Sequence, residues 1–123
     1  MTKGELAKQN FQSGLNCAQA VVLAFKEEMG LSESQLKKLI IGFGGGFGRQ
    51  RLVCGAVCGM TMVLSYLKSD GEDKLKCYEL IKCACTKVKE KIGSLTCAEL
   101  LNENKVPCAD ICSIVADITA EFI

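Results

Sequence analysis

The 123-residue chain has the length of one compact domain, and with 49% hydrophobic residues it can bury an ordinary core without cross-links. Fifteen basic residues stand against 14 acidic ones, so net charge offers no attraction for nucleic acid or for an anionic membrane. No histidine is present, which excludes the usual general base near neutral pH and the commonest nitrogen ligand of metals. We expect one domain over residues 1–123 and no nucleic-acid partner.

Cysteine is the unusual component of this composition. The first ten residues are polar and lack the apolar stretch of a secretory signal, which favours a reducing, cytoplasmic location. Structural disulfides are rare there, and nine is an odd number, so thiols, thiolates or metal ligands are the favoured interpretation. The nine are Cys17, Cys54, Cys58, Cys77, Cys83, Cys85, Cys97, Cys108 and Cys112.

Helix caps divide the N-terminal third of the chain. Thr2, Asn16 and Ser32 are good N-cap residues and predict three successive helices, of which the second ends at Gly30. The third helix breaks at the glycine-rich segment 42–48, the most unusual local feature of the sequence.

Residues 52–67 carry no charge and are apolar on nearly every side, which predicts a helix buried at the centre of a bundle. This segment is shorter than the ~20 residues that cross a bilayer, so we expect no membrane span. An amphipathic helix over 72–92, a short helix from Thr96 and a last helix from Pro107 complete the chain. The predicted fold is all-α, a single bundle of five to six helices.

The placement of cysteines on these helices suggests a shared site. Cys17, Cys97 and Cys108 fall in first turns, and Cys54 lies near the start of the central helix. The amide groups and dipole of a helix start favour thiolate, which is both the nucleophile and the metal ligand. Because residues four apart share a helix face, Cys58 could add a second sulfur beside Cys54. Cys108 and Cys112 are related in the same way.

Glycines accompany these cysteines. Gly55 and Gly59 would let another backbone, or a cluster, approach the central helix. Gly44, Gly45 and Gly46 do not fit a nucleotide-binding motif, and we interpret them as close packing and amide donors toward an anionic centre. Arg49 and Arg51 follow them as available counter-charges.

Several segments together carry a family resemblance. They are Gly14-Leu15-Asn16-Cys17-Ala18-Gln19-Ala20-Val21, Phe43-Gly44-Gly45-Gly46-Phe47-Gly48, Cys54-Gly55-Ala56-Val57-Cys58-Gly59, Cys97 and Cys112-Ser113-Ile114-Val115. In order and spacing they resemble the C-GCAxxG-C-C family of redox-active proteins, which is similar to the C-terminal region of split-Soret cytochromes. The central motif is spelled glycine, cysteine, alanine in the family name and cysteine, glycine, alanine here.

The resemblance implies a site made of four cysteines, Cys17, Cys54, Cys97 and Cys112, and it suggests an iron–sulfur or related centre. Cys108 competes with Cys112 for the last position, and Cys58 is a further candidate ligand.

Three hypotheses follow from these patterns. The first is a redox centre ligated by those four thiolates for electron transfer, iron–sulfur rather than the structural zinc that four thiolates also bind. The second is thiol–disulfide exchange or peroxide reaction, with Cys54 as a low-pKa attacking thiol and Cys17, Cys58 or Cys97 resolving it. Either would use an electron-transfer or thiol partner protein. The third is a non-catalytic helical domain with space-filling cysteines, which could form a homodimer through an apolar helix face.

The helix phase over 72–92 predicts that the cysteines differ in exposure. Cys83 lies with Glu79, Lys87 and Glu90 on the polar side, whereas Cys77 lies on the inner stripe. In the native protein, Cys83 should be alkylated rapidly and Cys77 slowly, as peptide mass spectrometry after timed labelling would measure. Equal protection of the two thiols would refute this phase.

Overall fold

The computed structural model describes all 123 residues and shows the predicted all-α fold. Six helices have eight residues or more, which agrees with the five to six predicted, and the remaining segments are short. In chain order the elements are α1 (Lys3–Gln12), α2 (Cys17–Ala24), α3 (Lys26–Met29), α4 (Glu33–Ile40), the 3₁₀ turn η1 (Ile41–Phe43), α5 (Gly44–Phe47), α6 (Gly55–Lys68), α7 (Lys74–Ile92), α8 (Cys97–Asn102) and α9 (Cys108–Glu121).

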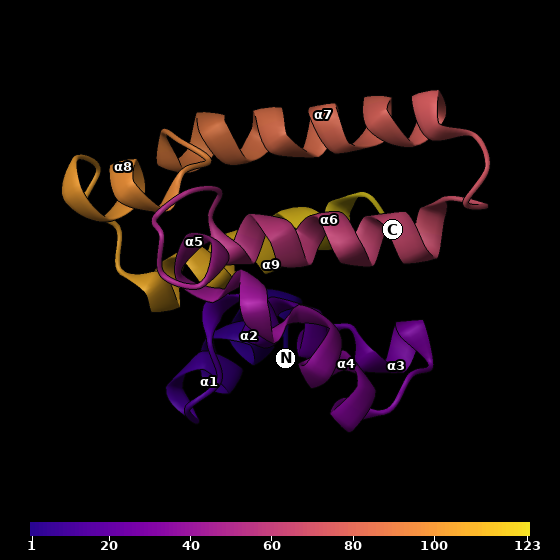
Figure 1. Ribbon diagram of the computed structural model, residues 1–123, viewed down its shortest axis with the longest axis horizontal. Coiled ribbons are helices and arrows are strands. Elements are labelled where there is room, and N and C mark those ends of the chain that lie inside the picture. The colour runs from indigo at the N-terminus through magenta and orange to yellow at the C-terminus, as the bar shows by residue number, and fades with distance from the viewer.

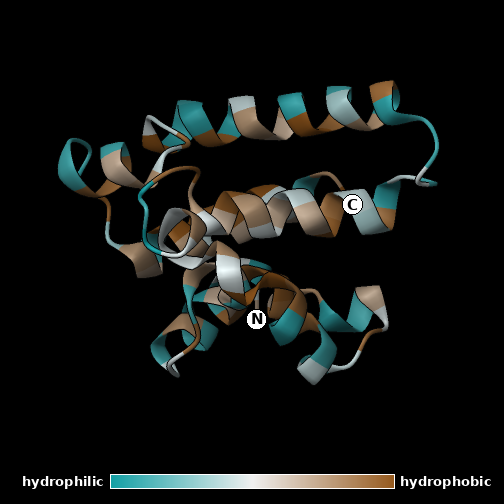
Figure 2. Cartoon of the chain, viewed as in Figure 1, coloured by the Kyte–Doolittle hydropathy of each residue, from teal (hydrophilic) through white to brown (hydrophobic).

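The helices are arranged in layers around α6, which is the central helix (Figure 1). It contacts α2 on one side, α9 alongside and α7 on the other side. Figure 2 shows α6 as largely hydrophobic and α7 as a helix with alternating hydrophilic and hydrophobic turns. The apolar stripe of α7 meets α6 and α9, while its charged side faces solvent. None of the helices combines the length and the hydrophobicity that a membrane-spanning segment needs.

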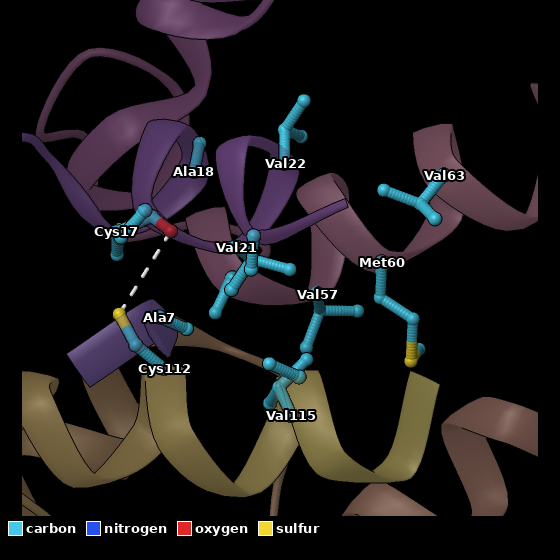
Figure 3. Packing of buried hydrophobic residues seen from close by; sticks show 14 of the residues in the cluster. Ala7, Cys17, Ala18, Val21, Val22, Val57, Met60, Val63, Cys112 and Val115 are labelled. Atoms are coloured by element: carbon cyan, nitrogen blue, oxygen red, sulfur yellow. Dashed lines mark hydrogen bonds between the residues drawn. The ribbon is translucent and has the colours of Figure 1, made fainter. Parts of the chain in front are cut away.

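Helix α2 is buried along its whole length. A capping box of Asn16 and Gln19 satisfies its first amide groups, so its N-terminus can enter the interior without unpaired donors. A Cβ at Gly59 would lie 3.0 Å from the carbonyl oxygen of Ala18, which shows how closely α6 packs against α2. Figure 3 shows Val21 among the buried hydrophobic side chains around this contact. The start of α2 is therefore fixed against the central layer.

The central helix begins at Gly55, later than the residue 52 that its apolar composition predicted. The preceding residues are extended and pair with the chain before α8: Cys97 N–H donates to the Leu52 carbonyl oxygen at 2.7 Å, and Cys54 N–H donates to that of Leu95 at 2.8 Å. The antiparallel bridge between Val53 and Thr96 lies between these bonds. Since these partners are more than 40 residues away, hydrophobicity alone could not indicate this break.

Exposure on α7 follows the predicted phase. Cys83 is exposed, and Cys77 and Cys85 are partly buried. Cys77 faces α6, with its sulfur 3.9 Å from the hydroxyl oxygen of Ser65.

Candidate cysteine-lined site

Four cysteines stand where helices begin. Cys17, Cys97 and Cys108 are the first residues of α2, α8 and α9, and Cys54 is the N-cap residue of α6. These are the positions expected from the caps and from Pro107. The paired segments before α6 and α8 hold Cys54 and Cys97 near each other.

All four of these cysteines line one cavity of about 470 Å³. Cys17, Cys54 and Cys97 are buried and Cys108 is partly exposed. The wall contains no aspartate or glutamate; its other members are Phe11, Gly14, Leu15, Asn16, Gly45, Arg49, Arg51, Leu101 and Ile111. The cavity is thus a thiol-lined, mainly apolar hollow with two guanidinium groups.

Cys112, the other candidate from α9, lies behind this wall. It is fully buried, and its thiol donates to the carbonyl oxygen of Cys17 with a sulfur–oxygen distance of 3.8 Å (Figure 3). Cys58 is one turn further along α6, half-buried and outside the cavity lining. The structure therefore brings Cys17, Cys54, Cys97 and Cys108 to one cavity, with Cys112 adjacent. Their roles as ligands stay a prediction.

Two glycines allow this convergence. A Cβ at Gly55 would lie 2.5 Å from Cys17 Sγ and 2.8 Å from the Phe43 carbonyl oxygen. A Cβ at Gly46 would lie 2.9 Å from Cys97 Cβ. Either side chain would displace a cysteine of the site, which is why these positions require glycine.

The other predicted glycines have different surroundings. Gly45 lines the cavity, Gly44 accommodates the Asn16 side chain, and Gly59 packs on α2. Contact between any of these glycines and a cofactor stays a prediction.

The loop after α5 has an unusual backbone. Phe47, Arg49 and Arg51 have φ values of 63°, 67° and 63°, a left-handed region that is costly for residues with a Cβ. The Arg51 N–H donates to the Gly45 carbonyl oxygen at 3.2 Å, and the Ala98 N–H donates to that of Arg51 at 3.3 Å. This conformation aims the Arg51 guanidinium at Cys97.

Arg51 Nη1 donates to Cys97 Sγ at 3.4 Å. This hydrogen bond, with the electrostatic attraction between the two side chains, raises the pKa of the Arg51 guanidinium. Both arginines that the sequence suggested as counter-charges line the cavity, and Arg51 has a specific sulfur partner.

Burial dominates the acidity of the deeper thiols. It raises the pKa of Cys54 to about 12, although the backbone N–H groups of Val57 and Ala56 favour the thiolate. Burial, followed by repulsion from Cys17 and Cys54, also raises the pKa of Cys112. The expectation of Cys54 as a low-pKa attacking thiol is wrong, because desolvation outweighs the helix start.

The donor groups are distributed around the cavity. No three cysteine, aspartate or glutamate side chains are gathered closely enough to hold a single metal ion.

Fold and site together define a small helical protein with a cysteine-lined cavity at the meeting point of helix starts. A family model described as "Putative redox-active protein (C_GCAxxG_C_C)" matches residues 15–122, and the chain belongs to this family. The match includes every helix from α2 to α9 and all nine cysteines. No curated protein and no solved structure matches the chain.

Replacing Gly55 by alanine should disturb the site directly. The new Cβ would overlap Cys17 Sγ, so the thiol or the backbone at Phe43 must move. We expect a loss of about 1–3 kcal/mol in the free energy of unfolding and an altered alkylation rate at Cys17. Gly42→Ala is the matched control, because a Cβ at that position meets nothing within 4 Å. Urea unfolding that shows equal effects for both variants would contradict the close approach.

The metal-free protein should lose stability at alkaline pH. Cys54 ionises near its ordinary value of 9.0 when unfolded but at about 12 when folded, so unfolding releases a proton between these values. The free energy of unfolding should therefore fall through that window, by about 1.4 kcal/mol per pH unit for each such thiol. Cys54→Ala should reduce this slope and Cys83→Ala should not. An unchanged slope in Cys54→Ala would disprove the assignment.

Proposed function

We propose that this protein is an electron-transfer protein whose cavity holds a thiolate-ligated iron–sulfur centre. The observation that supports it most is the presence of four thiols, from the starts of four helices, on one cavity wall without any carboxylate. Space-filling cysteines have no reason to meet at a hollow, because they pack equally well anywhere in a core.

The donor set and the volume favour a cluster over a single ion. Thiolates are soft ligands that bind iron–sulfur clusters or zinc, and imidazole ligation is excluded by the absence of histidine. A water molecule occupies about 30 Å³ of liquid volume, so a cavity of about 470 Å³ has room for a group of several atoms.

Helix α9 offers two thiols for the fourth position. The family pattern indicates Cys112, whereas the cavity lining favours Cys108, which is the partly exposed member of the pair. Cys112 is turned instead toward the Cys17 carbonyl oxygen. We propose Cys17, Cys54 and Cys97 as three ligands and Cys108 as the fourth, with Cys112 as the competing candidate.

Such a centre, when bound, would accept and release single electrons. The chain supplies the conditions for it: binding removes the thiol protons, which the Arg51 guanidinium facilitates at Cys97. The backbone N–H groups of Ala56 and Val57 do the same at Cys54. The apolar wall formed by Phe11 and Leu101 limits access of water.

Anaerobic purification tests the proposal. The protein should contain iron and acid-labile sulfide in about equal amounts, as common clusters do. Alanine variants of Cys17, Cys54, Cys97 and Cys108 should each lose most of both, while Cys83→Ala, which changes an exposed thiol on α7, should keep them. If Cys112→Ala loses iron and sulfide while Cys108→Ala keeps them, the fourth ligand is Cys112 rather than Cys108. Fully folded protein that takes up neither iron nor sulfide would contradict the proposal.

Thiol–disulfide exchange is a second candidate, supported by the pairing of Arg51 with Cys97. Because the Arg51 guanidinium donates a hydrogen bond to the Cys97 sulfur, Cys97 rather than Cys54 would be the attacking thiol. Mild oxidation of metal-free protein should then link Cys97 to one cavity partner, and mass spectrometry that finds scattered adducts instead would exclude this function.

A further inference from the structure

An exposed apolar patch lies beside the cavity. It consists of Ile41, Phe43, Phe47, Leu52 and Val53, whose exposed fractions are 58%, 38%, 38%, 49% and 38%. The rings of Phe43 and Phe47 meet edge to face with centroids 5.5 Å apart. Large side chains gathered on a surface in this way mark interaction sites more often than scattered ones do.

The patch and the cavity share one loop. Gly45, Arg49 and Arg51 line the cavity and lie within the same segment, 41–53, that carries the patch. Cys54 follows Val53 directly and is part of the cavity wall. Figure 1 shows α5 and this loop at the end of the bundle, next to α8. A partner on the patch would therefore bind next to residues of the cavity wall.

The chain segment that carries the patch has charge of one sign. From Ser34 to Ser69 the chain contains five basic residues and no acidic one. Lys38, Arg49 and Arg51 take part in none of the five ion pairs of the structure. The exposed Glu99 of α8 is likewise unpaired with either arginine. The chain as a whole is nearly neutral, so this is a local asymmetry.

We propose that the apolar patch and its cationic rim dock an acidic electron-transfer protein, an inference that rests on the proposed function of the cavity. The complementary face would carry carboxylates around an apolar centre, because opposite charges steer the encounter and apolar contact holds the complex. A second copy of this chain fits less well. A two-fold dimer through this patch would place Arg49 and its copy on the same interface, which like charges disfavour.

Calorimetric titration of the full-length, anaerobically purified protein tests this docking. The probe is a plant-type [2Fe–2S] ferredoxin, an acidic protein, and the control is mitochondrial cytochrome c, a basic one. We expect binding of ferredoxin alone, weakened by about tenfold when salt rises from roughly 20 to 200 mM.

Variants localise the contact. Arg49→Glu should raise the Kd for ferredoxin at least about tenfold, since it places a like charge at the interface. Phe47→Asn should raise it several-fold without backbone strain, because asparagine tolerates a positive φ. Lys82→Glu on the exposed side of α7 makes the same charge change away from the patch and should leave the Kd within about twofold.

Three results would overturn the inference. They are no binding of ferredoxin, equal weakening of ferredoxin binding by Lys82→Glu and Arg49→Glu, or a homodimer in analytical ultracentrifugation that Phe47→Asn dissociates. Iron and sulfide content of the same samples separates the two proposals. Protein without iron that still binds ferredoxin through Arg49 and Phe47 would refute the metal centre and keep the docking surface. Iron-loaded protein that does not bind ferredoxin would refute the docking surface and keep the metal centre.

Discussion

The close approach of the first turn of α2 to the start of α6 is the contact on which the site depends. It exists because Gly55 has no side chain where Cys17 Sγ lies. Gly59 continues the approach one turn further, against the Ala18 carbonyl oxygen. Burying an uncharged helix such as α2 between other helices is favourable, but its polar N-terminus can enter only because Asn16 and Gln19 satisfy the first amides. Cys17 is carried inside by that arrangement.

A second constraint brings the remaining thiols to the same place. The two hydrogen bonds that join the segments before α6 and α8 pair Cys97 with Leu52 and Cys54 with Leu95, and so hold the two cysteines near each other although 43 positions separate them in the sequence. The left-handed backbone at Arg51 is costly, and it is held by hydrogen bonds on both sides. This backbone conformation directs the Arg51 guanidinium at the Cys97 sulfur. A guanidinium beside clustered thiols offsets part of the cost of ionising a sulfur at this site, which agrees with membership of a family described as redox-active.

Local chemistry in the sequence was sufficient for most of the helices. The caps at Thr2, Asn16 and Ser32 act within a few residues, so the predicted helix starts agree with the structure. The second helix, expected to continue to Gly30, instead ends at Ala24 and is followed by the separate short helix α3. Non-local features were different. The extended segment before Gly55 depends on a partner near Thr96, and the high pKa of Cys54 depends on burial by other helices. Neither feature can be predicted from the spacing of hydrophobic residues along the chain. The two α9 cysteines share a face at four-residue spacing, and only packing separates one at the cavity from one behind it.

The claim that these thiols surround one redox centre is tested most directly by anomalous diffraction at the iron absorption edge, from crystals grown without oxygen. We predict a single anomalous peak inside the cavity, bordered by the sulfurs of Cys17, Cys54 and Cys97 and by one sulfur of α9. A peak elsewhere, for example between Cys77 and Cys83 at the surface hollow beside α7, would contradict this placement. A cavity without iron in protein kept free of oxygen throughout, with its thiols reduced and their positions unchanged, would also contradict the claim.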